Sequence, residues 1–449
     1  MLAPGVFKAN DIRGVVDVEW DEVGAWAIGR AYADIAPAGK IVVAKDMRLT
    51  GSRIQEGFIR GVTQGGVCVV DIGLASTDCL WFASGILDLP GVQITSSHNP
   101  GVYNGMKFCL EGAKPITAQF LRDLAQRARE IEADPPNPSG VSLGTVDTRD
   151  VLDDYVEYML AGVDLERIRR LKVVVDAGNG MGGHTVPAVF SKINVELVGL
   201  YMDLDGTFPN HEPNPLEPEN LRDAQEMVRS TGADLGLVFD GDADRVFVID
   251  ERGKTVPPSS IIAMISADAL ARQPGAAIVI NTITSAAVRE VIEELGGRAI
   301  ESKVGHTYMK SLMAHHDAVF GGEHSAHYYF REFFGADTGM LAALRILSLL
   351  GYSQSGLSEL VDVYARYAGS GEINLRVANQ SEVMARVAHA FSKDVSLSWH
   401  DGVKIAGDRW WVSLRGSNTE PLLRLNIEAP DEQSMMSLRK RVLSLVKEE

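Results

Sequence analysis

The chain has 449 residues and a formal net charge of −17 at neutral pH. A single hydrophobic core rarely grows beyond about 250 to 300 residues, so this length predicts several domains. The acidic balance argues against a protein that binds nucleic acid or a membrane surface, because such proteins carry an excess of Lys and Arg.

The three cysteines are Cys68, Cys79 and Cys109. They cannot all pair with one another, and their spacing does not suit a metal site. Reduced thiols are typical of the cytosol, so we expect a cytoplasmic location. The sequence has neither a secretory leader nor a run of about 18 apolar residues, which indicates a soluble chain.

The expected elements alternate between strands and helices in chain order. A helix with Val23 on its apolar face comes first, followed by strands at Ile41 to Ala44, Leu171 to Asp176 and Ala276 to Asn281. This alternation predicts βαβ units with parallel sheets, and the chemistry of such sheets lies beyond the carboxyl ends of the strands. After the third strand, apolar residues at helical spacing end at Leu295 and predict a second amphipathic helix.

Breaks between domains are indicated by composition. The stretch 134–140 is rich in Pro, and further breaks are expected near Arg252-Gly253 and at residues 369–371. The tail after the last break combines short strands with one amphipathic helix, an α+β pattern. We therefore predict four domains, at residues 1–148, 149–251, 252–368 and 369–449.

An apolar strand at residues 235–239 runs into Asp240-Gly-Asp-Ala-Asp-Arg245. In an extended loop, the period of two would point Asp240, Asp242 and Asp244 the same way. Like charges about 4 Å apart repel by roughly 4 kcal/mol at an intermediate dielectric, so the cluster needs a cation or protons. Oxygen ligands favour Mg²⁺ or Ca²⁺, but an EF-hand is excluded because Arg245 replaces its glycine and strands flank the loop.

Residues 178–183 fit the pattern Gly-x-Gly-x-x-Gly, which occurs in dinucleotide-binding folds. Such a site also needs an acid at the end of the next strand, and the nearest candidate, Glu196, lies inside that strand. We therefore interpret this segment as a tight turn between strand and helix.

The stretch 93–108 contains the most informative loop. A short apolar strand leads into a polar turn that displays Ser97, a hydroxyl that could carry a group covalently. His98 and Asn99 could steady such a group, and Lys107 follows across an Asn-Gly turn. A Ser/His/Asp triad is not expected, because nothing in the loop indicates that the His98 ring folds back onto the hydroxyl.

The segment Thr95-Ser-Ser97-His-Asn-Pro100 resembles the active-site serine loop of the alpha-D-phosphohexomutase family, which includes phosphomannomutases and phosphoglucomutases. The resemblance implies that Ser97, not Ser96, is phosphorylated. It also implies an α/β fold of four domains around a central cleft, in which three similar domains with mixed or parallel sheets precede a C-terminal α+β domain.

The acidic loop also resembles that family, whose metal loop is Asp-Gly-Asp-x-Asp-Arg. The resemblance implies one Mg²⁺ per chain, held by Asp240, Asp242, Asp244 and an oxygen on phosphorylated Ser97. It places Arg245 beside the phosphoserine.

Two loops of the third region resemble family loops that contact the sugar. Gly321-Gly-Glu-His-Ser-Ala-His327 is similar to the sugar-selecting loop, which implies that Glu323 and Ser325 bind sugar hydroxyls. Ala326 replaces the usual Gly, which places the backbone freedom of this loop in question. Lys303-Val-Gly-His306 resembles the loop whose histidine lies near the substrate.

The segment Arg415-Gly-Ser-Asn-Thr-Glu-Pro421 offers the many short donors and the guanidinium that a phosphate dianion requires. A β-hairpin turn uses the same residue types. The segment resembles the family's phosphate clamp, which implies this role for Arg415, Ser417, Asn418 and Thr419, with Arg424 in support.

At the N-terminus, the resemblance places Arg13 near the phosphoryl group in transfer. Asn10 replaces a family tyrosine and removes a ring that contacts the substrate.

These resemblances predict a phosphohexose mutase that interconverts mannose 6-phosphate and mannose 1-phosphate, with glucose phosphates as further candidate substrates. Phosphorylated Ser97 and a hexose 1,6-bisphosphate would be the intermediates, and Lys107 and His306 are the candidate acid and base. The expected partners are small hexose phosphates, with neither nucleic acid nor membrane, and both a monomer and a homodimer are compatible with the sequence. The alternatives are a phosphoglucosamine mutase, a Mg²⁺-dependent sugar-phosphate phosphatase and a non-catalytic sugar-phosphate binder.

Overall fold

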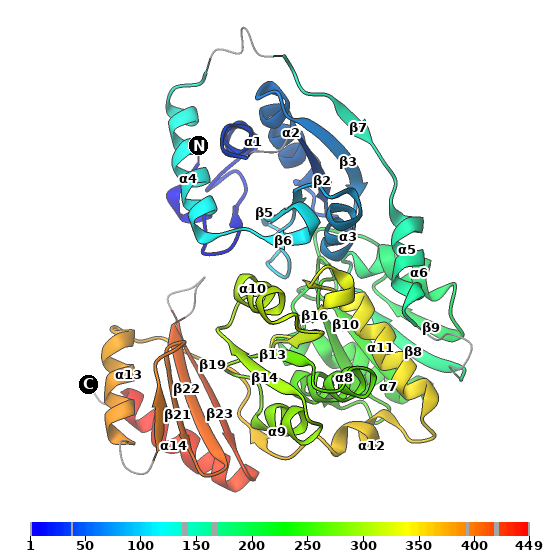
Figure 1. Ribbon diagram of the computed structural model, residues 1–449, viewed down its shortest axis with the longest axis vertical. Coiled ribbons are helices and arrows are strands. Elements are labelled where there is room, and N and C mark those ends of the chain that lie inside the picture. The colour runs from blue at the N-terminus through cyan, green and yellow to red at the C-terminus, as the bar shows by residue number, and fades with distance from the viewer. Residues whose placement is uncertain are drawn as a thin grey trace. The chain divides into compact units, whose positions relative to one another are not determined.

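The computed structural model describes residues 2–36, 39–136, 142–163, 169–391, 395–416 and 422–447. They form two compact units, each described by itself below. The first unit comprises Met1–Pro257 and Ser325–Leu360, and the second comprises Pro258–His324 and Val361–Glu449. Figure 1 shows the helices and strands of both.

The first unit begins with a mixed sheet and its helices. The bounds are β1 (Ile12–Val15), α1 (Glu22–Ile35), β2 (Lys40–Lys45), α2 (Gly51–Gln64), β3 (Cys68–Leu74), α3 (Thr77–Leu87), β4 (Gly91–Ile94), β5 (Tyr103–Leu110), β6 (Lys114–Pro115), α4 (Ala118–Ala133) and β7 (Val146–Thr148). The strand order is β1-β5-β4-β2-β3-β7, with β6 beside β5. The pairs of β2 with β3 and β4 are parallel, and those of β5 are antiparallel.

Helices α1, α2 and α4 pack together over this sheet (Figure 1). Helix α1 begins at a cap in which the Asp21 carboxylate accepts hydrogen bonds from the backbone N–H groups of Val23 and Gly24. The predicted helix is therefore present, but Val23 is 49% exposed. Its expected place on the buried face was wrong, because it lies in the first turn beside the solvent-facing cap.

A second sheet of the first unit holds the acidic loop. Its elements are α5 (Leu152–Ala161), β8 (Leu171–Asp176), α6 (Gly182–Phe190), β9 (Val195–Leu200), α7 (Arg222–Thr231), β10 (Leu235–Phe239), β11 (Val246–Asp250) and β12 (Thr255–Val256). The order is β12-β11-β10-β8-β9, in which β8 runs parallel to β9 and β10. Strand β10 is buried along its whole length, as its apolar sequence predicts.

Three further elements complete the first unit. An antiparallel hairpin of β16 (Tyr328–Phe330) and β17 (Ala336–Asp337) precedes α11 (Gly339–Tyr352), after which α12 (Leu357–Asp362) follows in sequence. The N-cap Thr338 of α11 accepts a hydrogen bond from the backbone N–H of Leu341 and donates one from its hydroxyl to Asp78. This cap joins α11 to the first turn of α3.

The second unit begins with parallel strands and helices: α8 (Pro258–Arg272), β13 (Ala277–Asn281), α9 (Ala286–Glu294), β14 (Arg298–Ser302), α10 (His306–His316) and β15 (Phe320–Gly322). Strand β13 runs parallel to both β14 and β15. The helix predicted after β13 is present, and Val288, Val291 and Ile292 are buried in it. Leu295 was wrongly placed on that face, because it follows the last helical residue and is 49% exposed.

The tail of the second unit is an antiparallel sheet with two helices. Its elements are β18 (Ala368–Gly369), β19 (Ile373–Leu375), α13 (Gln380–Ala390), β20 (Ser396–Ser398), β21 (Val403–Gly407), β22 (Trp410–Gly416), β23 (Leu423–Ala429) and α14 (Glu432–Lys447). The order is β18-β23-β22-β21-β20, with β19 also on β23. Helices α13 and α14 pack on the sheet around an apolar core (Figure 1).

The predicted fold class is confirmed, since mixed α/β sheets precede a C-terminal α+β sheet. The exact domain boundaries remain predictions. Among the described helices, none has both the length and the apolar character needed to cross a bilayer.

Candidate active site

Two loops of the first unit meet at Ser97. One follows β4 and the other follows β10, so each begins at the carboxyl end of a strand. The Ser97 hydroxyl donates a hydrogen bond of 3.0 Å to Asp240 Oδ2. A Cβ atom at Gly241 would lie 2.5 Å from the Ser97 carbonyl oxygen, so only glycine allows this approach of the two backbones.

The carboxylates of Asp240, Asp242 and Asp244 converge in the second loop. Each residue is at most 1% exposed, and one oxygen of each lies within 4.8 Å of the others. The extended backbone expected here was wrong, because residues 240–245 form a turn in which Ala243 has a φ of 60°. The turn brings the three side chains together, while strands on both sides of it agree with the exclusion of an EF-hand.

Two cations lie among these carboxylates. Lys107 Nζ is 2.6 Å from Asp242 Oδ2 and 2.5 Å from Asp244 Oδ2, and Arg245 Nε donates to Asp240 Oδ2 at 2.8 Å. Three carboxylates therefore face two cations and retain a surplus of negative charge. Asp242 Oδ1 is buried and has no hydrogen-bond partner in the structure. A bound hard cation would give this oxygen the partner that it lacks. The three carboxylates therefore fit Mg²⁺.

The pKa values follow from burial and from these pairs. Burial raises the pKa of Asp240 above its usual value, Arg245 opposes this, and the neighbouring carboxylates add to it. Burial alone would lower the pKa of Lys107, but Asp242 and Asp244 hold it above its usual value. Lys107 is therefore a proton donor at neutral pH and unsuited to act as a base.

Helix α3 directs its N-terminus at the same group. The backbone N–H of Thr77 donates to the Asp242 carbonyl oxygen at 3.0 Å, and the Thr77 hydroxyl donates to Asp242 Oδ2 at 2.5 Å. The positive end of the helix dipole stabilises a negative group at this position. Thr77 could not be assigned from the sequence, because only the fold brings it to the loop.

The Ser97 backbone adopts a left-handed conformation with a φ of 50°. Its N–H donates to Thr95 Oγ1 at 2.9 Å, and the Thr95 hydroxyl donates to Asp46 Oδ2 at 2.6 Å. In this conformation His98 Nδ1 lies 3.3 Å from Ser97 Oγ. The expectation that the ring does not fold back was wrong, because it assumed an ordinary backbone at Ser97.

The His98 imidazole is neutral at physiological pH. Desolvation lowers its pKa well below the usual value, and the cations Arg245, Arg13 and Lys107 lower it further. A neutral ring beside Ser97 Oγ can exchange a hydrogen bond with the hydroxyl without adding charge.

Arg48 binds the backbone of the serine loop. Its role was not assigned from the sequence. Its guanidinium, buried in the structure, donates to the backbone carbonyl oxygens of residues 97, 99, 100 and 103 at 2.7 to 2.9 Å. Asp46 accepts from its Nε at 3.3 Å. The available signal was Asp46-Met-Arg48 at the end of an expected strand, but its partners lie about fifty residues away in sequence.

Arg13 also contacts the serine loop. Strand β1 pairs with β5, and this pairing sets Arg13 opposite Gly105. Arg13 Nη1 donates to Asn99 Oδ1 at 2.8 Å, and its Nε donates to Asp11 Oδ2 at 2.7 Å. The structure thus places Arg13 at the serine loop, where Asn99 and Asp11 orient it. Asn10 precedes the strand and is half-buried.

His327 stands in the motif of residues 321–327, but no role was assigned to it from the sequence. An antiparallel β-bridge joins its backbone to Arg245, and its Nε2 lies 3.9 Å from Asp244 Oδ1. Its Nδ1 is 2.9 Å from the Ser325 hydroxyl. Ala326 between them has a φ of 65°, so this departure from the family's glycine is accommodated in a strained backbone.

The remaining described candidates lie in the second unit. Glu323 is 2% exposed and accepts hydrogen bonds from Asn281 Nδ2 at 3.2 Å and from the Gly305 N–H at 3.0 Å. Lys303 Nζ lies 5.9 Å from the centre of the Tyr308 ring, and His306 is the first residue of α10. Glu323, Lys303 and His306 are thus grouped around the start of α10.

Arg415 and Arg424 pair across β22 and β23. Both form ion pairs with the single carboxylate of Glu372, at 3.1 and 3.3 Å. Burial lowers the pKa of Arg415, and Glu372 opposes this shift. The carboxylates of Asp401 and Glu323 also act to raise the pKa of Arg415. Two adjacent guanidinium groups are able to bind a phosphate dianion. Ser417, Asn418 and Thr419 lie outside the described residues.

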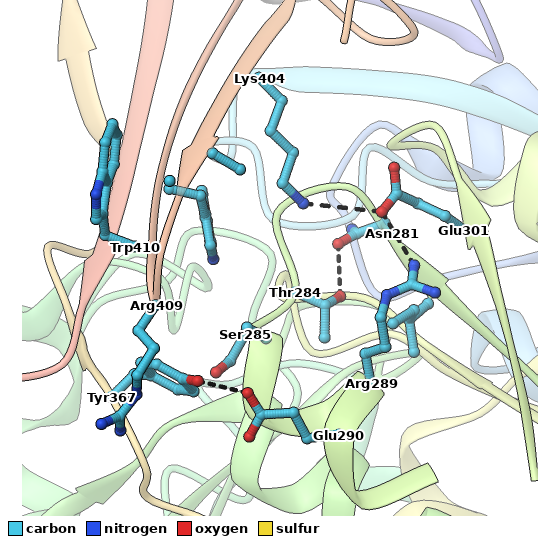
Figure 2. Close-up of a pocket in the computed structure, with 15 residues that line it drawn as sticks. Asn281, Thr284, Ser285, Arg289, Glu290, Glu301, Tyr367, Lys404, Arg409 and Trp410 are labelled. Carbon is cyan, nitrogen blue, oxygen red and sulfur yellow. Dashed lines mark hydrogen bonds and ion pairs between the residues drawn. The ribbon is translucent and has the colours of Figure 1, made fainter. Parts of the chain in front are cut away.

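The second unit also contains a cavity of about 290 Å³ beside the β21–β22 hairpin (Figure 2). Its cations already have partners: Arg289 pairs with Glu301 at 3.1 Å, and Lys404 donates to the Thr282 carbonyl oxygen at 2.6 Å. The cavity therefore lacks an adjacent pair of arginines on neighbouring strands, as found at Arg415 and Arg424.

Four domain descriptions of one family match the chain. They are Phosphoglucomutase/phosphomannomutase, alpha/beta/alpha domain I at residues 4–134, domain II at 153–253, domain III at 257–367 and the C-terminal domain at 372–445. The chain belongs to this family. Members of the family are mutases, so the chain is an isomerase whose substrates are hexose phosphates.

Known relatives match nearly the whole chain. It is similar to a phosphomannomutase of Escherichia coli, with 38% identity over 98% of this chain and 99% of the relative. It is also similar to the phosphohexose mutases of Xanthomonas campestris pv. campestris (strain ATCC 33913), with 37% identity over 98% of each. A crystal structure of a phosphoglucomutase/phosphomannomutase family protein from Burkholderia thailandensis matches with 30% identity and a TM-score of 0.91, over 100% of this chain and 98% of that chain.

Proposed function

We propose that the chain is a phosphomannomutase that interconverts mannose 6-phosphate and mannose 1-phosphate through a phosphorylated Ser97. The observation that carries this proposal is the 3.0 Å hydrogen bond between Ser97 and Asp240 inside a buried acidic group. The nearly full-length similarity to relatives named phosphomannomutase supports mannose as the sugar.

We further propose that Asp240, Asp242, Asp244 and an oxygen on phosphorylated Ser97 hold one Mg²⁺. When bound, Mg²⁺ would withdraw charge from the phosphoryl oxygens and make the phosphorus more open to attack. Asp240 already contacts the Ser97 hydroxyl, which supports a metal next to the phosphoryl group. Lys107 and Arg245 then limit the repulsion among the carboxylates.

In the proposed transfer step, a sugar hydroxyl attacks the phosphorus on Ser97. A bond forms between phosphorus and the sugar oxygen, and the bond between phosphorus and Ser97 Oγ breaks. The hydroxyl proton passes to a base, and Ser97 Oγ receives a proton as it leaves. The product is a hexose 1,6-bisphosphate, which returns the phosphoryl group from its other end to Ser97 and also serves as activator.

The charges around Ser97 suggest roles in this step. Arg13, held by Asn99, and Arg245, held by Asp240, are cations able to meet the charge that develops on the phosphoryl oxygens. We propose Lys107 as the acid, because its pKa lies above the usual value and the side chain therefore carries a proton at neutral pH.

We propose His327 as a base beside the acidic loop, together with His306, the candidate from the sequence. His98 would act through its hydrogen bond to Ser97, orienting the oxygen without taking its proton.

Recognition of the rest of the substrate is proposed for the loops predicted from the sequence. Arg415 and Arg424, with Ser417, Asn418 and Thr419, would hold the phosphate that is not being transferred. Glu323, Ser325 and Lys303 would bind sugar hydroxyls. The adjacent guanidinium groups of Arg415 and Arg424 support the first role, and the buried carboxylate of Glu323 supports the second.

Cys68, Cys79 and Cys109 form no disulfide in the structure, which supports the expected cytoplasmic location. A monomer and a homodimer both remain compatible with the proposal.

Competing assays with mannose, glucose and glucosamine phosphates test the substrate, using a trace of the matching hexose 1,6-bisphosphate and Mg²⁺. We expect the highest kcat/KM with mannose 1-phosphate, and no such turnover by Ser97→Ala. Ser96→Ala is the matched control, because its hydroxyl is one residue away and lies 3.4 Å from Asn99. A higher kcat/KM with glucosamine phosphate would replace the proposal by a phosphoglucosamine mutase, and steady release of free phosphate would replace it by a phosphatase.

A further inference from the structure

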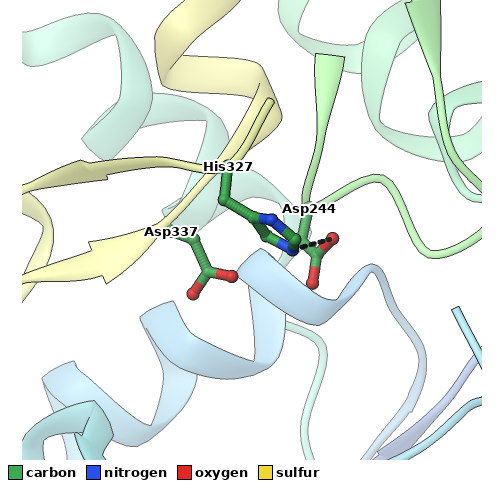
Figure 3. Close-up of side chains that lie close together, drawn as sticks. All are labelled: Asp244, His327 and Asp337. Carbon is green, nitrogen blue, oxygen red and sulfur yellow. Dashed lines mark ion pairs between the residues drawn. The ribbon is translucent and has the colours of Figure 1, made fainter. Parts of the chain in front are cut away.

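Asp244 presents its two carboxylate oxygens to different neighbours. Oδ2 lies 2.5 Å from Lys107 Nζ, on the side shared with Asp242. Oδ1 is buried, has no hydrogen-bond partner in the structure and lies 3.9 Å from His327 Nε2. Figure 3 shows Oδ1 directed at the imidazole. An orphaned carboxylate oxygen in a residue that is 1% exposed calls for a ligand of its own.

The His327 ring is fixed in an orientation suited to binding a metal through Nε2. Ser325 Oγ lies 2.9 Å from Nδ1, and the backbone bridge to Arg245 holds the residue next to the acidic loop. Histidines that bind metals usually make a hydrogen bond through the other ring nitrogen, which fixes the tautomer and the ring direction.

Asp337 completes the group from the end of β17. It is 3% exposed, and one ligand atom each from Asp244, His327 and Asp337 lie within 4.8 Å of one another (Figure 3). One imidazole and two carboxylates suit Zn²⁺, Mn²⁺ or Co²⁺ better than Mg²⁺, which prefers oxygen ligands alone. We propose that Asp244, His327 and Asp337 form a second metal site that takes a transition-metal dication and shares Asp244 with the Mg²⁺ group.

The charges allow two cations at this place. A carboxylate that binds one ion through each oxygen can bridge two dications, which in known two-metal sites lie about 3.5 to 4 Å apart. Lys107 lies on the Oδ2 side of Asp244, at 2.5 Å, and the cation nearer the Oδ1 side is Arg245, whose Nε is 4.0 Å from Oδ1 and donates to Asp240 at 2.8 Å. Its guanidinium is therefore engaged by Asp240.

An ion on His327 Nε2 would prevent that nitrogen from taking a proton. In a consequence that rests on the proposed role of His327, Zn²⁺ would then inhibit the mutase even at saturating Mg²⁺. The binding itself does not depend on that role.

Metal binding to the full-length protein tests the site directly. The measurement is equilibrium dialysis against Zn²⁺, with the double variant Asp242→Asn/Asp337→Asn as the baseline. The wild type should bind two more Zn²⁺ ions per chain than this double variant. Each single variant, Asp242→Asn or Asp337→Asn, should lose one of them. Glu332→Gln removes a half-exposed carboxylate that pairs with Arg345 and is the matched control, with both ions retained.

The nitrogen of His327 distinguishes the proposed second site from the Mg²⁺ group, whose ligands are all oxygen atoms. With Cu²⁺ as the spectroscopic probe, imidazole coupling in the electron paramagnetic resonance spectrum should persist in Asp242→Asn and disappear in both Asp337→Asn and His327→Gln. The ion that Asp337→Asn still binds would show that this variant is folded.

The proposal is overturned if the wild type binds only one ion more than the double variant, or if Asp337→Asn binds as many ions as the wild type. It is also overturned if the imidazole coupling survives His327→Gln. Mutase activity measured with Mg²⁺ alone is a separate readout, so a failure of the proposed function does not imitate a failure of this site.

Discussion

In the first unit three buried carboxylates surround Lys107 and Arg245, whereas in the second unit Arg415 and Arg424 share the single carboxylate of Glu372. The first group is therefore built on carboxylates and the second on two adjacent guanidinium groups. A buried surplus of negative charge is unfavourable unless a counter-ion is bound, and paired guanidinium groups suit a dianion. The comparison supports the proposed cation in the first unit and the proposed phosphate in the second.

The largest effect is expected from breaking the first group. Asp242→Asn replaces a charged oxygen ligand and cancels the negative surplus around Lys107 and Arg245, so kcat/KM should fall on the order of 10³-fold. The measurement is mutase activity as a function of Mg²⁺ concentration. Asp147→Asn is the control, because Asp147 is a surface carboxylate paired with Lys40. A loss smaller than tenfold at every Mg²⁺ concentration would contradict the role given to the acidic group.

Asp78 is a carboxylate buried near the acidic group, and its pH dependence shows what such burial costs in the free energy of unfolding. Burial raises its pKa from 3.8 to about 6, and Asp244 adds to the shift. Below about pH 4 the group is protonated in both the folded and unfolded states, and its contribution to stability is fully present. As the pH rises to about 6, the folded state retains a proton that the unfolded state releases, so the free energy of unfolding falls by up to about 3 kcal/mol.

In Asp78→Asn the free energy of unfolding should not show this pH-dependent loss. Chemical denaturation of wild type and variant between pH 4 and 7 measures the free energy of unfolding. The difference in the free energy of unfolding between wild type and variant should decline over that range and then become constant. A difference independent of pH would show that Asp78 is ionised in the fold at all these pH values. Its partners, the hydroxyls of Ser76, Tyr155 and Thr338, would then stabilise the charged form.

The geometry of the serine loop can be altered without removing any charge. In Arg48→Lys an ammonium replaces the guanidinium that holds the carbonyl oxygens of residues 97 to 103, and lysine cannot reach all of them. We expect kcat to fall about 100-fold with little change in KM, because the left-handed Ser97 backbone loses its support. Arg53→Lys, on the surface beside Asp17, is the control. Equal changes in KM and kcat would indicate general damage to the fold.

The smallest effect is expected in the second unit. Arg415→Lys keeps the charge but loses the planar donor pair, so KM should rise about tenfold while kcat changes little. Steady-state kinetics with mannose 1-phosphate checks this, with Arg409→Lys as the control because Arg409 is exposed and lies over the Tyr367 ring. If kcat fell and KM did not change, Arg415 would contact the phosphoryl group in transfer.

Local patterns in the sequence predicted the parts of the site that lie within single loops. The Ser97 loop, the Asp240 to Arg245 turn and the β22–β23 pair each follow from a strand and the polar residues directly after it. Asp240 meets Ser97 as the family resemblance implies, although β4 and β10 belong to different sheets. The tight turn chosen for residues 178–183 is present, with Gly178 at a φ of 51°, and Glu196 in β9 pairs with Arg170.

The residues that sequence reasoning missed act over long distances in the chain. Arg48 and Thr77 reach partners about 50 and 165 residues away, so no local spacing identifies them. His327 stood in a quoted motif, but its place beside Asp244 depends on a backbone bridge to Arg245. The position of the His98 ring depends on one left-handed φ at Ser97, which its Ser-Ser-His context does not reveal.

The central claim is that Ser97 carries the phosphoryl group between substrate and product. Protein labelled with ³²P by a hexose 1,6-bisphosphate should carry the label on the peptide that contains Ser97, and Ser97→Ala should carry none. On rapid mixing with unlabelled mannose 6-phosphate, the label should pass to mannose phosphates as fast as turnover. Label on another residue, or its release as inorganic phosphate at the turnover rate, would contradict the account.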